Sequence, residues 1–246
     1  MRRASLLVDF VAVVIPAHDE EEMIGPCLEA LDRACRHEAL RGLEVRPILV
    51  LDRCSDSTGE RSEAAARTTA RRLTILETCR ANVGVARRRG FETALELSEG
   101  LDPRRAWFAT TDADTLVRPD WLAGQLAWRQ RRVDAVAGTV EVGSWAEQPG
   151  TLPRRYERHV KRHGLGLGHP HVHGANLSFS RASYEAAGGM PALPADEDHA
   201  MWHALKISGA VAVAVPDIPV ATSARREGRA PKGFSGFLRD LGSRPA

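Results

Sequence analysis

The chain of 246 residues has little of what marks the specialised classes of protein. Its four cysteines form no CxxC pair, which argues against a thiolate zinc site and favours reduced thiols packed in the interior. It has no apolar run of about 18 residues, so no segment is predicted to span a membrane. The formal net charge is only +2, which gives no sign of a nucleic-acid partner. We therefore expect a globular, cytoplasmic protein.

Two common nucleotide-binding signatures are also missing. No G-x-G-x-x-G follows the first apolar segment, which argues against a dinucleotide-dependent dehydrogenase. No G-x-x-x-x-G-K-[ST] occurs anywhere, which argues against a P-loop enzyme.

The sequence does contain a regular alternation of apolar segments and helical patterns. Strands are predicted at 11–15, 45–51, 73–77 and 106–111, and helices at 23–35, 59–71 and 83–97. Pro16 is expected to end the first strand. The alternation predicts an α/β fold with one mixed, mostly parallel, Rossmann-like sheet flanked by helices.

The pattern is looser after about residue 133. Further strands are predicted near 134–142, 172–180 and 211–215, and further helices near 151–163 and 195–208. The glycines of 164–168 predict a flexible loop, and the tail from 223 to 246 is also expected to be flexible. Because the chain has neither an internal repeat nor a long linker, we expect a single domain, 1–246.

Three polar segments, 16–20, 52–56 and 112–114, each follow a predicted strand. Ligands of parallel α/β sheets bind beyond the carboxyl ends of the strands. Asp112 and Asp114 lie there with one small residue between them, and Mg²⁺ prefers carboxylate oxygens together with the phosphates of a substrate. These segments therefore predict a site for a cation and a phosphate-bearing ligand.

Six segments resemble, in order along the chain, the motifs of the family 2 glycosyltransferases. They are 13–21 (VVIPAHDEE), 50–58 (VLDRCSDST), 82–90 (NVGVARRRG), 111–114 (TDAD), 174–190 (from GANLSFSR to GGM) and 197–198 (ED). The resemblance covers about 11–215 and implies a GT-A fold, a nucleoside-diphosphate-sugar donor and a divalent cation, Mg²⁺ or Mn²⁺. It also implies a donor half, 1–115, and an acceptor half, 116–246.

The resemblance implies which residues bind the donor and the metal ion. The donor-binding residues are Pro16, Ala17, His18, Glu20, Asp52, Arg53, Arg87, Asp112, Ala113 and Asp114. Asp114 is expected to bind the cation directly, and Asp112 to contact the ribose or to reach the cation through water. Arg53 departs from the family, which often has an aspartate here that touches the base. Because an arginine cannot accept a hydrogen bond from a uracil imide, the identity of the base stays open.

The resemblance also implies the residues of the reaction itself. Asp198 is the expected general base, and a single displacement would invert the anomeric centre. Glu197 is the second expected catalytic residue and would orient the acceptor. A cation would stabilise the charge that grows on the leaving diphosphate. Gly174 and Asn176, in the segment 174–190, are expected to bind the acceptor. Apart from the resemblance, His173 and Trp145 are also expected to bind it, Trp145 because sugar rings stack on aromatic side chains. The acceptor is expected to be the hydroxyl of a small molecule, a saccharide or a lipid-linked compound at the inner membrane face.

Two further clusters of residues are open to more than one interpretation. The histidines at 159, 163, 169, 171 and 173 could form a zinc site, recognise the acceptor, or belong to a polar mobile loop beside the site. Arg225 and Arg229 could contact the donor diphosphate or a phosphorylated acceptor, because guanidinium groups suit phosphate, or belong to a solvated tail.

Two other functions compete with glycosyl transfer. A sugar-nucleotide nucleotidyltransferase also uses an α/β sheet and carboxylate-bound magnesium, but it would carry a glycine-rich basic loop near the N-terminus. The acidic segment 19–22 disfavours that class. A catalytically silent, nucleotide-binding interaction subunit is disfavoured by the intact set of Asp112, Asp114 and Asp198.

Overall fold

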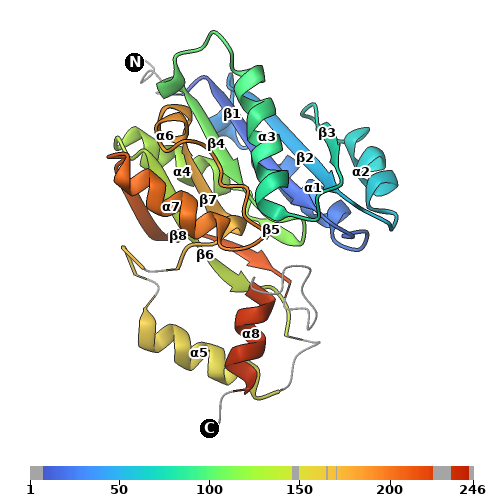
Figure 1. Cartoon of the computed structure of the whole chain (residues 1–246), viewed down its shortest axis with the longest axis vertical. Coiled ribbons are helices and arrows are strands. Elements are labelled where there is room, and N and C mark those ends of the chain that lie inside the picture. Colours follow the sequence, from blue (N-terminus) through green and yellow to red (C-terminus); the bar gives the residue numbers. More distant parts are fainter. Residues whose placement is uncertain (1–7, 146–149, 165, 170, 224–233, 244–246) are drawn as a thin grey trace.

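The computed structural model describes residues 8–145, 150–164, 166–169, 171–223 and 234–243, and these contain one mixed sheet flanked by helices (Figure 1). Within them, eight strands lie in the order β3-β2-β1-β4-β7-β6-β8-β5. The strands are β1 (Phe10–Ala17), β2 (Glu44–Asp52), β3 (Thr74–Thr78), β4 (Ala106–Thr110), β5 (Thr115–Val117), β6 (Ala135–Val142), β7 (Leu177–Ser180) and β8 (Ala212–Thr222). The predicted α/β fold is confirmed.

The half of the sheet formed by β3, β2, β1 and β4 is parallel. β7 runs antiparallel to β4 and β6, β8 runs parallel to β6, and β5 runs antiparallel to β8. Because β1, β2 and β4 are parallel neighbours, the loops after them emerge at one edge of the sheet. The predicted site segments therefore share that edge.

β1 is buried along its whole length and runs through Pro16 to Ala17, whereas the sequence predicts that the strand ends at the proline. The Thr111 N–H donates to the Val14 carbonyl, so the polar backbone groups of Val14 face β4. Since backbone groups alternate in direction along a strand, Pro16 faces the same side as Val14. The pairing with β4 ends at Val14, so the missing N–H of Pro16 leaves no ladder hydrogen bond unmade.

The helices cover both faces of the sheet. They are α1 (Ile24–Cys35), α2 (Thr58–Ala66), α3 (Val83–Leu97), α4 (Trp121–Gln130), α5 (Leu152–His163), α6 (Arg181–Ala186), α7 (Glu197–Ile207) and α8 (Phe234–Ser243), with short 3₁₀ turns at Glu38–Leu40, Pro103–Arg105 and Gly174–Asn176. Alternate residues of β1 point to opposite faces: Val11 and Val13 pack with α1 and α4, and Phe10 and Ala12 pack with α3, α6 and α7.

α5 and α8 pack on each other beyond the end of the sheet (Figure 1). Leu152 of α5 and Leu238 and Leu241 of α8 form a small separate apolar cluster. The sequence predicts a flexible tail over 223–246, but residues 234–243 form a helix whose apolar side chains pack on α5. No helix among the described residues is long and apolar enough to cross a bilayer.

Candidate active site

The candidate site lies beyond the carboxyl ends of β1, β2 and β4. Asp112 and Asp114 follow β4 directly, and the first turn of α7 supplies Glu197 and Asp198. These two pairs of carboxylates come from opposite halves of the chain. They meet because Arg87, in the second turn of α3, reaches both of them.

Arg87 is almost completely buried, with 3% of its side chain exposed. One Nη atom donates to Asp112 Oδ1 and the other to Glu197 Oε1, while Nε donates to Thr110 Oγ1 at 3.2 Å. Burial alone would lower the pKa of Arg87, but Asp112 and Glu197 raise it above its ordinary value. The buried guanidinium is therefore charged and bridges the end of β4 to the start of α7.

Gly174 connects this ion pair to Asp198. A Cβ at position 174 would lie 2.3–2.8 Å from three atoms of the Arg87 guanidinium, so only glycine lets the guanidinium lie against the backbone there. The Gly174 N–H donates to Asp198 Oδ2 at 2.7 Å, and the His199 N–H donates to Oδ1 at 2.7 Å. Asp198 is therefore fixed beside the Arg87 cluster by two backbone hydrogen bonds.

The site carries more negative than positive charge. The pKa of Asp112 is raised to about 6 by burial, against the effect of Arg87, with further contributions from Asp114, Glu197 and Asp198. The pKa of Glu197 is also raised by burial, again against the effect of Arg87. One guanidinium thus faces four carboxylates, and a divalent cation would relieve their mutual repulsion.

The carboxylates of Asp112 and Asp114 fit a hard divalent cation. Both supply the oxygen atoms that Mg²⁺ and Mn²⁺ prefer. Asp112 Oδ1 is taken by Arg87, and no described residue donates a hydrogen bond to Oδ2. The Thr222 hydroxyl lies 3.4 Å from Asp114 Oδ1, and the Ser223 N–H donates to the Asp114 carbonyl, so the end of β8 holds the second aspartate.

The family model for glycosyl transferase family 2 matches residues 12–188. The chain belongs to this family. No curated protein matches it in sequence. The mannosyltransferase PcManGT from Pyrobaculum calidifontis, solved with GDP-Man and Mn²⁺, is 20% identical with a TM-score of 0.65, over 96% of this chain and 65% of that one. The fragment 1–349 of TarS from S. aureus is 14% identical with a TM-score of 0.60, over 94% of this chain and 64% of that one.

A third similar structure is glucosyl-3-phosphoglycerate synthase from Mycobacterium tuberculosis in complex with phosphoglyceric acid. It is 12% identical with a TM-score of 0.57, over 100% of this chain and 88% of that one. These likenesses show that the family 2 chain has the predicted GT-A fold. The chain spans only about two thirds of the length of the PcManGT and TarS chains that it matches.

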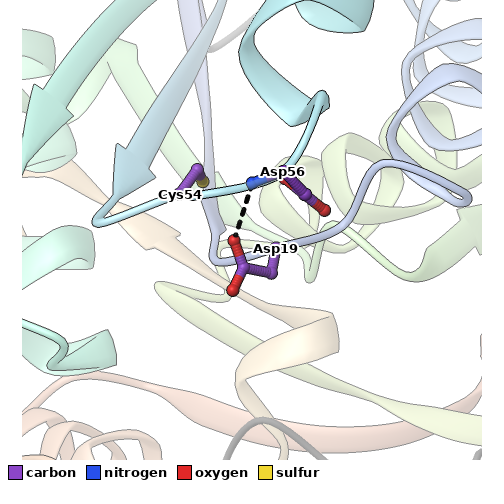
Figure 2. A group of neighbouring side chains, drawn as sticks. All are labelled: Asp19, Cys54 and Asp56. Atoms are coloured by element: carbon purple, nitrogen blue, oxygen red, sulfur yellow. Dashed lines mark hydrogen bonds between the residues drawn. The ribbon is translucent and has the colours of Figure 1, made fainter.

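In this family 2 chain, the segments after β1 and β2 are tied together (Figure 2). Asp19, with a φ of 51°, accepts hydrogen bonds from the N–H of Ser55 at 2.7 Å and of Asp56 at 3.4 Å. Cys54 completes a group of three side chains whose ligand atoms lie within 4.8 Å of one another. The hydrogen bonds give this group a structural role, because they hold the first two predicted donor segments in register.

The other predicted residues of the first segment line the same turn. Pro16 and Ala17 end β1, and Ala17 is buried. His18 Nδ1 lies 2.7 Å from the Asp52 carbonyl, which makes Nδ1 the protonated nitrogen. Glu20 is buried, and its N–H donates to Thr58 Oγ1.

Asp52 is buried, and its carboxylate is occupied by the backbone. Oδ1 accepts from the N–H groups of Arg80 and Ala81, both at 2.9 Å, and Oδ2 accepts from Asn82 at 2.7 Å. Ala81 has a φ of 48°, so the turn needs this support. Asp52 therefore holds the loop that begins α3, which in turn carries Arg87.

Arg53 and Ala113 lie next to the aspartates of their motifs. Arg53 is exposed, has a φ of 55°, and its N–H donates to the Thr78 carbonyl. Ala113 is buried between the two metal-binding candidates, with 3% exposed. Both thus lie at the predicted edge of the sheet, Arg53 facing solvent and Ala113 facing the core.

Asn176 differs from the expectation that it binds the acceptor. Its side chain is 1% exposed, and all of its polar atoms are used inside the protein. Oδ1 accepts from Trp121 Nε1 at 2.9 Å, while Nδ2 donates to the carbonyls of Thr139 at 2.9 Å and Ile218 at 2.7 Å. The geometry corrects the expectation: Asn176 joins α4, β6 and β8 and leaves no donor for an acceptor.

Three histidine rings, those of His159, His169 and His173, lie around the ring of His171. The ring of His171 lies 5.9 Å from that of His159, 6.1 Å from His169 and 6.4 Å from His173, measured between centroids. Among the described residues, their nitrogens do not converge as Asp19, Cys54 and Asp56 do, which disfavours a preformed zinc site. Burial lowers the pKa of His173 to about 4, with His171 adding to the effect and Asp198 opposing it.

The remaining predicted residues lie away from this cluster or outside the described parts of the chain. The Trp145 ring is partly buried and packs at 5.4 Å from Tyr156, against the apolar cluster of α5 and α8. Arg225 and Arg229 lie outside the described residues, and so does the side chain of His163. Two further residues of the site are not indicated by any motif: Thr110 contacts Arg87, and Thr222 contacts Asp114. A lone threonine at a strand end gives no signal that could have identified them.

Proposed function

We propose that the chain is an inverting glycosyltransferase that moves a sugar from a nucleoside-diphosphate sugar to a hydroxyl acceptor, with help from a divalent cation. One observation carries the proposal. The carboxylate of Asp198 lies in the same charged cluster as Asp112 and Asp114, connected through Gly174 and Arg87. A metal-assisted leaving group and a base can therefore act on one bound sugar.

Asp114 would bind the cation, with Oδ2 of Asp112 beside it, while Thr222 and Ser223 hold Asp114 in place. When bound, the cation supplies positive charge to the diphosphate as the bond to the sugar breaks. Asp52 supports this arrangement indirectly, because the loop that it fixes begins α3. The segment 16–20 and Arg53, after the neighbouring strands, would line the nucleotide.

Asp198 would take the proton of the acceptor hydroxyl as its oxygen attacks the anomeric carbon. Each of its oxygens accepts only one backbone hydrogen bond, so capacity remains for a substrate hydroxyl. The two N–H groups hold the carboxylate in one orientation. One displacement on the face opposite the leaving diphosphate inverts the configuration.

The nearby histidines would form the acceptor side of the site. His173 directly precedes Gly174, and its low pKa keeps the ring neutral at physiological pH, so it would offer a hydrogen bond without a charge. Trp145, whose ring packs on Tyr156, would stack on the acceptor. We place the reaction in the cytoplasm, at the inner membrane face if the acceptor is lipid-linked.

The named ligands of the similar structures guide the choice of substrates for a test. PcManGT was solved with GDP-Man and Mn²⁺, and TarS 1–349 with UDP. We would therefore measure the thermal unfolding of the full chain with UDP, GDP, ADP, CDP and dTDP, each with and without Mn²⁺. A bound ligand raises the unfolding temperature by mass action.

We expect one nucleotide to raise the unfolding temperature only when Mn²⁺ is present, and Asp114→Asn to abolish that increase. Glu44→Gln is a matched control, because Glu44 lies at the opposite end of β2. The corresponding nucleotide sugar is then tested for transfer, with the anomeric configuration of the product read by NMR. The corresponding nucleoside triphosphates are measured in the same way. Stabilisation by a triphosphate with release of pyrophosphate would favour a nucleotidyltransferase, and binding without any turnover would favour a silent interaction subunit.

A further inference from the structure

We propose that Arg87 is a positioning residue, held by Glu197 and Gly174, which sets Asp112 toward the cation and Asp198 toward the acceptor. The proposal rests on the proposed function, since it concerns the same site. It assigns Arg87 to the interior of the protein rather than to the donor, and it assigns Glu197 to Arg87 rather than to the acceptor.

Arg87 fixes the rotation of the Asp112 carboxylate. A planar guanidinium offers its donors in a rigid fork, and here the fork is shared between Asp112, Glu197 and Thr110. Because Asp112 Oδ1 is bound on one side, Oδ2 is the oxygen left for a cation. A lysine would supply the same charge at a single point and would not hold both carboxylates at once.

Gly174 connects the position of Arg87 to that of the base. The guanidinium lies where a Cβ of residue 174 would be, so the backbone at this position and Arg87 touch directly. The N–H of the same residue holds Asp198 Oδ2. A shift of either Arg87 or Gly174 therefore changes the distance between Asp198 and Asp112.

Glu197 acts on the site through Arg87. Its side chain is only 5% exposed, and its carboxylate pairs with Arg87, so it has little surface to offer an acceptor. Its negative charge balances part of the charge of Arg87, at the Nη atom that does not bind Asp112. Without the charge of Glu197, more of the positive charge of Arg87 acts on Asp112, and Asp112 attracts a cation less strongly.

The test uses two variants that disturb Arg87 in different ways without removing a candidate metal ligand. Gly174→Ala adds a methyl group against the guanidinium and leaves every charge in place. Glu197→Gln removes one charge but keeps an oxygen that accepts from Arg87. Gly25→Ala is a control, because nothing lies within 4 Å of its added Cβ, and Glu44→Gln is a charge control. Affinity for Mn²⁺ with UDP, and separately with GDP, is measured by calorimetry on the full chain.

We expect both variants to weaken binding of Mn²⁺ and the nucleotide by about fivefold or more, and both controls to bind as the wild type does. The double variant should bind Mn²⁺ and the nucleotide with the same affinity, to within about twofold, as the single variant that has the lower affinity. The reason is that both changes act through Arg87. Wild-type affinity in both variants, or multiplicative losses in the double variant, would overturn the positioning role.

Two additional outcomes are covered by the same design. If Gly174→Ala does not fold by circular dichroism, Arg87→Lys replaces it, and it is expected to weaken binding by a similar factor for the reason given above. Wild-type affinity in Arg87→Lys would then overturn the role. A wild-type chain that binds neither Mn²⁺ nor any nucleotide would overturn the proposed function together with the inference, whereas normal wild-type binding that the variants leave unchanged overturns the inference alone.

Discussion

Replacing Asn176 by alanine tests whether this residue binds the acceptor or holds the fold. The substitution removes three hydrogen bonds and leaves the Trp121 N–H and the carbonyls of Thr139 and Ile218 without their partner. All three of these residues are at least nine-tenths buried. An unsatisfied buried polar group costs about 1–3 kcal/mol.

We therefore expect Asn176→Ala to lower the free energy of unfolding by about 3–9 kcal/mol, a large share of the roughly 5–15 kcal/mol of a typical domain. Urea unfolding followed by tryptophan fluorescence measures the loss. Gln130→Ala, which removes an exposed amide, is the control and should change stability little. Gly138→Ala gives an independent check, because its Cβ would lie 2.3 Å from Asn176 Nδ2 and should also destabilise the fold.

If Asn176→Ala lowers the free energy of unfolding by less than about 1 kcal/mol and raises the KM for the acceptor, the structural role of Asn176 is refuted. That combination would mean that the Asn176 amide is available to a ligand and that the internal hydrogen bonds contribute little. A large loss of stability with an unchanged acceptor KM in the remaining folded protein is the expected result.

Three further results are expected. Asp198→Asn should lower the transfer rate by about two to four powers of ten while donor affinity, measured by calorimetry, stays the same; a near-normal rate would place the base elsewhere. Affinity for Mn²⁺ should fall as pH drops below about 6, because a proton on Asp112 then competes with the cation, and Asp112→Asn should remove this dependence; a wild-type affinity that is flat from pH 7 to 5 would contradict it. Burial lowers the pKa of His173 from 6.5 to about 4. Between pH 6.5 and pH 4 this side chain is therefore protonated in the unfolded chain and neutral in the folded one, so the free energy of unfolding should fall as the pH drops through that range. His173→Gln should lessen that fall in urea unfolding at pH 5 relative to pH 7.5, and an equal fall in the variant would count against it.

Most of the parallel half of the fold was predictable because β1, β4 and most of β2 are buried on both faces. β1, β2 and β4 read as continuous apolar runs, and their ends bring Asp112 and Asp114 to one edge of the sheet. Elements that are very short, or that form only through contacts with distant parts of the chain, have no continuous apolar run that predicts them. β5 has three residues and exists because it pairs with β8, and α8 forms where its apolar side chains meet α5.

The ion pair at the centre of the site could not be predicted from the sequence. Arg87 and Glu197 are 110 residues apart, and neither belongs to a local pattern that specifies the other. The sequence also does not reveal why residue 174 has to be a glycine, because the reason is the Arg87 guanidinium that lies against it. These residues become a unit only when α3, the end of β4 and the start of α7 are packed together.

Membership of a family motif does not by itself distinguish a residue that touches a ligand from one that holds the scaffold. Asp52 and Asn176 both lie in motif segments, yet their polar atoms are used by backbone amides, backbone carbonyls and an indole. Asp198 lies in a motif too, but each of its oxygens accepts a single backbone N–H, so it can still accept a proton from a hydroxyl. Burial, together with the hydrogen bonds already made inside the protein, is thus what separates the two groups: Asp198 is half-buried, whereas Asp52, Asn176, Arg87 and Glu197 are buried. On this basis we propose that Asp198 takes part in the reaction, and that Asp52, Asn176, Arg87 and Glu197 form the framework that positions it.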